Sequence, residues 1–175
     1  MVINTTRFGQ VSLNNEDILQ FNEGLLGFAD LRKFVLLDDP NDEIFAWLQS
    51  CESPQIAFPV LEPELFAPNF KVNLTKSDLE SLKLADAKKA RYFCIVTIPD
   101  DPTQMTANLK APVIINVQEK IARQCVLQDN NLAIREPIFA MLQQRVVSNP
   151  AVSIKNQSNV LDVAVKIDPS SSAEL

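Results

Sequence analysis

The chain has 175 residues, of which 46% are hydrophobic and 22% are charged, values that are typical of one folded domain or two small ones. It contains no histidine, which excludes Ser-His-Asp and Cys-His nucleophiles, histidine-ligated zinc and an imidazole general base. The formal net charge of −6 at pH 7 argues against direct binding of RNA or DNA, because an acidic surface repels phosphates.

Short apolar runs separated by Pro, Asn, Asp or Gly dominate the first two-thirds of the sequence and predict strands. The intervals leave no room for a helix between most pairs of runs, which favours antiparallel strands over a doubly wound α/β fold. We therefore expect an all-β, mainly antiparallel fold, namely a small barrel-like β domain with one or two short helices. The predicted strands cover residues 2–8, 18–21, 34–37, 44–48, 56–61, 70–74, 92–98, 105–109, 113–117 and 121–127.

A helix start is predicted after the last strand of the first half. Thr75 can accept a hydrogen bond from the amide of Asp78, and the Asp78 side chain can reach back toward Thr75. A helix is therefore expected to begin directly after Thr75. A further one-turn helix is predicted over residues 29–33, after the glycine-rich turn.

The C-terminal part of the chain has a different pattern. Apolar residues recur every four positions over residues 137–147, which predicts a second helix with its proline in the first turn. The chain beyond this helix is mostly polar. Apolar and polar residues alternate over residues 163–167, which indicates an edge strand, and residues 169–172 are predicted to form a loose tail. We therefore predict a β domain over residues 1–145 and a flexible C-terminal extension over residues 146–175.

Cysteine spacing and the N-terminus indicate the compartment. The three cysteines lie 43 and 31 residues apart, which fits neither a disulfide framework nor a C-x-x-C site. The first residues lack the basic and apolar regions of a secretory signal, and no apolar run approaches 18 residues. We expect a cytoplasmic protein with reduced cysteines, no metal, no cofactor and no membrane partner.

Negative charge is concentrated in one segment, which we call the acidic stretch. No Lys or Arg lies between Lys33 and Lys71, whereas seven acids do. Such a stretch attracts basic proteins, or it is only a solvated face that keeps the protein soluble. Catalytic carboxylate pairs and a calcium loop fit less well, because the prolines indicate turns and the glycine of an EF-hand is missing. The seven acids are Asp38, Asp39, Asp42, Glu43, Glu52, Glu62 and Glu64.

Four motifs combine apolar residues with Gly, Pro or Asn at fixed positions. They are F-x-x-G-L-x-G-F over residues 21–28, W-L-Q-S over 47–50, N-L-x-A-P with a later N over 108–116, and Q-x-V-L over 124–127. With these motifs in this order, the chain resembles the flagellar assembly factor FliW family over about residues 2–140. The resemblance is strong because the four motifs keep the order of the family.

The resemblance implies a small, barrel-like, non-enzymatic protein of the bacterial cytoplasm that binds two protein partners. One partner is flagellin, bound through its C-terminal region. The other is the translational regulator CsrA, which represses flagellin translation. The resemblance implies that a protein of this family binds CsrA as an allosteric rather than a competitive antagonist and so relieves this repression. Flagellin that accumulates takes the factor away from CsrA, and translation falls. The alternative is a flagellin chaperone or an interaction module without a regulatory role.

Partner contacts are expected on two patches of motif residues and on the acidic stretch. We predict that the acidic stretch steers binding to CsrA, whereas apolar contacts dominate binding to flagellin. Each aromatic candidate fits core packing as well as a surface anchor. The candidate residues are Glu23 and Phe28 at the glycine turn, Trp47 and Phe58 on the aromatic strands, Asn108, Leu109 and Asn116 on the later strand pair, and Asp38, Asp39, Asp42 and Glu43.

Overall fold

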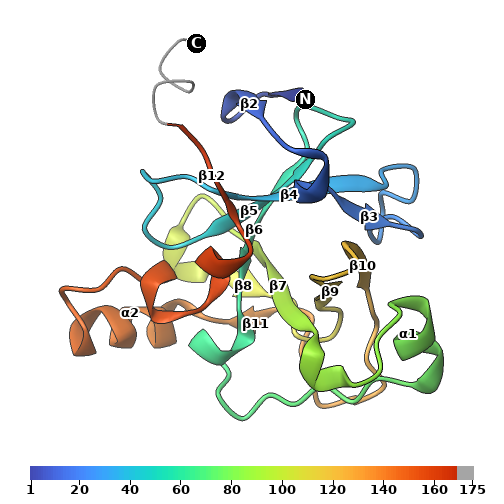
Figure 1. Ribbon diagram of the computed structural model, residues 1–175. Helices are drawn as coiled ribbons and strands as arrows, with labels where there is room; N and C mark the ends of the chain where they lie inside the picture. Colours follow the sequence, from blue (N-terminus) through green and yellow to red (C-terminus); the bar gives the residue numbers. More distant parts are fainter. Residues whose placement is uncertain (169–175) are drawn as a thin grey trace.

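The computed structural model describes residues 1–168, in which seven strands close into a barrel (Figure 1). Each barrel strand pairs with the next, β7 pairs with β9, and β10 returns to β3. The β10–β3 pairing is parallel and the other six are antiparallel, so the predicted all-β, mainly antiparallel fold is confirmed. The barrel strands are β3 (Leu19–Phe21), β4 (Lys33–Asp38), β5 (Ala46–Ser50), β6 (Ala57–Leu61), β7 (Arg91–Thr97), β9 (Val113–Asn116) and β10 (Ile121–Gln124).

Among the described residues, five further strands lie outside this ring. β1 (Val2–Thr5) and β2 (Gly9–Ser12) form an antiparallel hairpin. The single strand predicted over residues 2–8 is therefore wrong, because Thr5 Oγ1 accepts the Phe8 amide at 2.8 Å and turns the chain before β2. β8 (Thr106–Ala107) joins β7 to β11 (Glu136–Pro137), and β12 (Val165–Lys166) pairs with β4 in parallel.

The two predicted helices are present, with one change of boundary. Helix α1 (Lys76–Ser81) begins after Thr75, whose Oγ1 accepts the Asp78 amide at 3.1 Å while Asp78 accepts the Thr75 amide at 3.1 Å. Helix α2 (Phe139–Ser148) begins two residues after Pro137, because Pro137 pairs in β11 instead of entering the first turn.

Two predicted elements are absent from the described residues. The expected strand over 70–74 is an irregular, partly exposed segment that leads into the cap of α1 and has no partner strand. The expected helix over 29–33 is also wrong, since residues 29–30 form a turn and Lys33 already belongs to β4. Pairing with distant strands decides both outcomes, because Lys33 pairs within β4 whereas residues 70–74 find no partner strand.

Apolar side chains of the strands form two large cores, and a smaller cluster that includes Leu82 and Ile114 lies beside α1. Phe34, Leu48 and Ile115 belong to a cluster that draws on all seven barrel strands and therefore fills the barrel interior. Val35 and Trp47 belong to a second cluster on the outer side, which also contains residues of the β1–β2 hairpin and α2. Burial of this kind stabilises the fold by about 1.5–3 kcal/mol for each large side chain.

The described part of the predicted extension packs against the barrel. Ile154 and Ile167 are both 3% exposed and belong to the outer core. The predicted boundary at residue 145 falls inside α2, and the alternation over 163–167 forms the edge strand β12. The tail predicted at 169–172 lies outside the described residues.

Candidate partner-binding surfaces

The chain makes a tight turn between β3 and β4, and glycine makes this turn possible. Gly24 has a φ of +66°, and a Cβ atom there would lie 2.5 Å from the carbonyl oxygen of Phe28. The Phe28 amide donates to the Leu25 carbonyl at 2.8 Å, and the Leu26 amide donates to Gln124 Oε1 at 3.0 Å. The turn is thereby fixed to β10, and Leu26 remains 55% exposed.

An apolar groove of about 240 Å³ lies beside this turn, and we call it the turn groove. Phe58 lines it, and the Phe28 ring packs edge-on against Phe58 with centroids 5.4 Å apart. Leu26 and Ile134 add aliphatic side chains that are 55% and 65% exposed. Exposed apolar surface with a few polar groups is typical of protein–protein contact sites. The lining residues are Leu25, Leu26, Phe58, Ile95, Thr97, Asn108, Gln124, Ile134 and Arg135.

The turn groove brings together three of the predicted residues from three separate parts of the sequence. Phe58 and Asn108 line it, and Phe28 supports Phe58 from the turn. The Asn108 side chain also accepts the Ala111 amide at 3.0 Å, which fixes the loop after β8. Leu26 and Ile134 are not among the predicted residues.

Glu23 joins the glycine turn to α1 through a charged network. Its Oε2 atom lies 3.0 Å from Arg123 Nε, and Arg123 Nη1 lies 3.4 Å from Asp78 Oδ1. Arg123 Nη1 also donates to Ser81 Oγ at 3.1 Å. Because Glu23 is 64% exposed, this pair contributes less than about 1 kcal/mol and mainly orients the turn.

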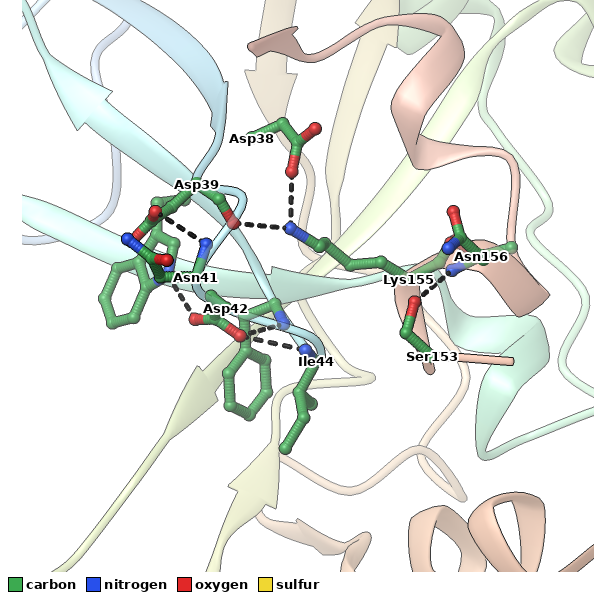
Figure 2. Close-up of polar contacts among 11 residues, drawn as sticks. Asp38, Asp39, Asn41, Asp42, Ile44, Ser153, Lys155 and Asn156 are labelled. Atoms are coloured by element: carbon green, nitrogen blue, oxygen red, sulfur yellow. Dashed lines mark hydrogen bonds and ion pairs between the residues drawn. The ribbon is translucent and has the colours of Figure 1, made fainter. Parts of the chain in front are cut away.

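The loop between β4 and β5, residues 39–45, contains three of the four contact residues predicted in the acidic stretch, and we call it the acidic loop. Asp42 holds its C-terminal half in place, as Figure 2 shows. Asp42 Oδ1 accepts the amides of Ile44 and Phe45, each at 2.9 Å, and Oδ2 accepts Trp47 Nε1 at 2.8 Å. The Asp42 carboxylate is therefore a structural group whose acceptors are already occupied.

Lys155 from the C-terminal extension reaches the N-terminal end of the acidic loop (Figure 2). Its Nζ forms an ion pair with the Asp38 carboxylate and donates to the Asp39 carbonyl at 2.8 Å. Within residues 1–168, the side chains of Asp39 and Glu43 form no ion pair. The negative charges of this loop that no described cation pairs with are therefore those of Asp39, Asp42 and Glu43.

The remaining acids of the acidic stretch lie elsewhere and have separate roles. Glu52 Oε1 accepts the backbone amides of Arg32 and Lys33 at 2.6 and 2.8 Å. Glu62 is 7% exposed and lies 2.6 Å from Arg91 Nη2. Burial raises the pKa of Glu62 to about 7, although the positive charge of Arg91 opposes this shift. The acidic stretch is therefore not one uniformly charged face.

Three predicted contact residues lie in the interior. Trp47 is 6% exposed, and the guanidinium carbon of Arg7 stands 4.0 Å from its ring centroid. Leu109 is also 6% exposed and belongs to the outer core. Asn116 donates through Nδ2 to the carbonyl of Leu82 at 2.8 Å, which ties β9 to the end of α1. These residues support the surfaces from within.

The described residues offer little that would hold a metal ion or a reactive thiolate. Among residues 1–168, no group of three or more Cys, Asp or Glu side chains is arranged for metal binding. Burial raises the pKa of Cys51 to about 11 and the pKa values of Cys94 and Cys125 to about 12, which keeps these thiols protonated. No helix in this part of the chain is both long and apolar enough to span a membrane.

Comparison with known proteins identifies the family. The family described as FliW protein matches residues 2–138. A flagellar assembly factor FliW from Bdellovibrio bacteriovorus is 74% identical over 175 residues, which cover 100% of both chains. Another from Thermoanaerobacter pseudethanolicus is 37% identical over 144 residues, 82% of this chain and 96% of the relative. A crystal structure of the flagellar assembly factor FliW, 30% identical, superposes with a TM-score of 0.74 over 79% of this chain and 97% of that one.

These matches define a class of small β-barrel assembly factors of the bacterial flagellum. The chain belongs to the flagellar assembly factor FliW family. The resemblance expected from the four sequence motifs is thereby confirmed.

Proposed function

We propose that this protein is a non-enzymatic, cytoplasmic flagellar assembly factor that binds flagellin and antagonises CsrA, and so relieves repression of flagellin translation. The observation that carries the proposal is the 74% identity, over the whole chain, to a flagellar assembly factor. Two surfaces of opposite chemistry, the turn groove and the acidic loop, support two separate partners. Flagellin that accumulates would draw the protein away from CsrA.

The turn groove is proposed as the contact for the C-terminal region of flagellin. Its exposed aliphatic residues Leu26 and Ile134 flank the half-buried ring of Phe58. Apolar and aromatic groups at the centre of an interface contribute most of the binding free energy. Binding to flagellin should therefore depend little on salt.

The acidic loop is proposed as the contact for CsrA. Asp39 and Glu43 suit a test of its charge best, because Asp38 pairs with Lys155 and the Asp42 carboxylate accepts three hydrogen bonds, whereas the Asp39 carboxylate accepts the Asn41 amide. Exposed charges act mainly on the association rate and are screened beyond about 8–10 Å at physiological salt. The Asp39→Asn/Glu43→Gln variant should associate with CsrA about tenfold more slowly at low salt.

Biosensor kinetics with purified flagellin and CsrA test both assignments. The Leu26→Ser variant should weaken flagellin binding about tenfold and leave CsrA binding unchanged, since it removes one central apolar contact. Val147→Ser is the matched control, because Val147 is 74% exposed but lies on α2, outside the turn groove. Equal losses in both variants would refute the groove assignment.

The same kinetic measurements separate the proposed regulator from the alternative. Binding to flagellin without any binding to CsrA would indicate a chaperone or interaction module with no regulatory role. Binding to CsrA that ignores both salt and the Asp39→Asn/Glu43→Gln change would show that the acidic loop serves solubility only.

A further inference from the structure

Lys155 contacts the acidic loop at both of its ends. Its Nζ bonds to the Asp38 carboxylate and to the Asp39 carbonyl, where the loop begins. Its backbone amide donates to the carbonyl of Glu43 at 3.1 Å, near the loop's end. The Ile167 amide adds a bond of 2.9 Å to the Asp38 carbonyl. One residue therefore bridges the two halves of a seven-residue loop.

The extension is itself firmly anchored, so that Lys155 is held in place. Ile154, next to it in the chain, and Ile167 are each 3% exposed within the outer core. Val160 is 4% exposed and packs against the barrel interior cluster. Lys155 is itself only 6% exposed, which is unusual for a lysine without a specific structural role. These contacts describe a rigid support.

Other bonds to the acidic loop are short-range and come from residues within the loop or beside it. Asp39 Oδ1 accepts the Asn41 amide at 3.0 Å, and the Asp39 carbonyl accepts the Asp42 amide at 2.9 Å. Asp42 adds its bonds to Ile44 and Phe45. The Asp42–Trp47 bond and the buried Phe45 side chain anchor the C-terminal half of the loop on the barrel, whereas the N-terminal half is held by local turns and by Lys155.

We propose that Lys155 is a positioning residue that fixes the acidic loop, and that this ordering, rather than loop charge alone, sets the affinity for a basic protein partner. The idea rests on the proposed function for the choice of CsrA as the partner. Lys155 lies outside residues 2–138, the part of the chain that matches the family. This contact with the acidic loop therefore requires the C-terminal extension. A loop that is already ordered loses less conformational entropy when the partner binds.

Charge and ordering predict opposite effects when Lys155 is replaced. Without this lysine the loop region gains one unit of negative charge, so steering alone predicts faster association with a basic partner. Ordering predicts weaker binding, because the loop must then be fixed during association. The sign of the change therefore identifies the mechanism.

The experiment compares Lys155→Met with the Asp38→Asn/Lys155→Met double variant, in the full-length protein. The double variant removes both members of the ion pair, which keeps the wild-type net charge and leaves no unpaired buried charge. Hydrogen exchange should become at least tenfold faster at the amides of residues 41–45 in both variants. CsrA should bind both variants about five- to tenfold more weakly, with flagellin binding unchanged.

Two control variants complete the design. Lys166→Gln removes an exposed lysine from the same extension and should change neither quantity, and Lys155→Arg should restore most of the binding. Unchanged loop exchange in both Met variants would overturn the inference, as would CsrA binding that stays equal or becomes tighter. A wild-type protein that does not bind CsrA would overturn the proposed function and this inference together, whereas the preceding outcomes overturn this inference alone.

Discussion

Replacement of Trp47 by alanine removes a buried indole from the outer core. The ring packs edge-on against Phe8 and Phe45, with centroids 6.0 and 6.4 Å away, and carries the Arg7 guanidinium above it. Truncation of a buried tryptophan costs about 3–5 kcal/mol. Loss of the indole N–H also leaves Asp42 Oδ2 without its 2.8 Å partner, which adds about 1 kcal/mol. We expect the free energy of unfolding to fall by about 4–6 kcal/mol.

Urea unfolding followed by far-ultraviolet circular dichroism measures this loss, because Trp47 is the only tryptophan and its fluorescence disappears with it. In a chain of this size, each kcal/mol corresponds to about 2–4 °C, so the melting temperature should fall by about 8–24 °C. Trp47→Phe keeps an aromatic ring in the core but loses the N–H donor and part of the buried indole surface. This variant should lose about 1–3 kcal/mol.

A different result would show that Trp47 is a surface anchor. If Trp47→Ala unfolds within about 1 kcal/mol of the wild type but no longer binds a partner, the packing argument is wrong.

Three further predictions concern stability at other positions. The folded-state pKa of Glu62, about 7, lies above its ordinary value of 4.5. The contribution of protonated Glu62 to the free energy of unfolding is therefore complete below pH 4.5 and disappears as the pH rises through 7. Between pH 5 and 8 the wild type should therefore lose about 2 kcal/mol relative to Glu62→Gln in urea unfolding, and parallel profiles would contradict this. Gly24→Ala should cost more than about 2 kcal/mol and Gly27→Ala only about 1–2 kcal/mol, because both have positive φ but only Gly24 is crowded; equal losses in thermal melts would refute the steric argument. Thr75→Ala should cost about 1 kcal/mol through the lost cap of α1, and Thr75→Ser should restore it.

Features that depend on neighbouring residues were predictable from the sequence. The reciprocal bonds of Thr75 and Asp78 involve residues three positions apart, so the chain segment alone specifies them. The short apolar runs bounded by turn residues likewise predicted a strand at each of the seven barrel strands. Pro137 shows the limit of this reasoning, since a proline suited to a helix start pairs with β8 instead.

Features of the candidate surfaces depend on residues far apart in the chain. Phe28 and Phe58 meet because the barrel places the glycine turn beside β6, and neither motif specifies the other. Lys155 and Asp38 are 117 positions apart, and the polar segment around Lys155 shows no periodicity that would indicate a buried lysine. Leu26 was open to prediction, because an aliphatic residue between two turn glycines has few neighbours to cover it.

Partner exchange is the central claim, and a competition experiment tests it most directly. Purified flagellin is titrated into a preformed complex of the protein with CsrA, and the released CsrA is measured by size-exclusion chromatography with light scattering. The proposed function predicts stoichiometric release of CsrA, with the protein moving into a complex with flagellin. A stable ternary complex, or a CsrA complex that persists in excess flagellin, would contradict it.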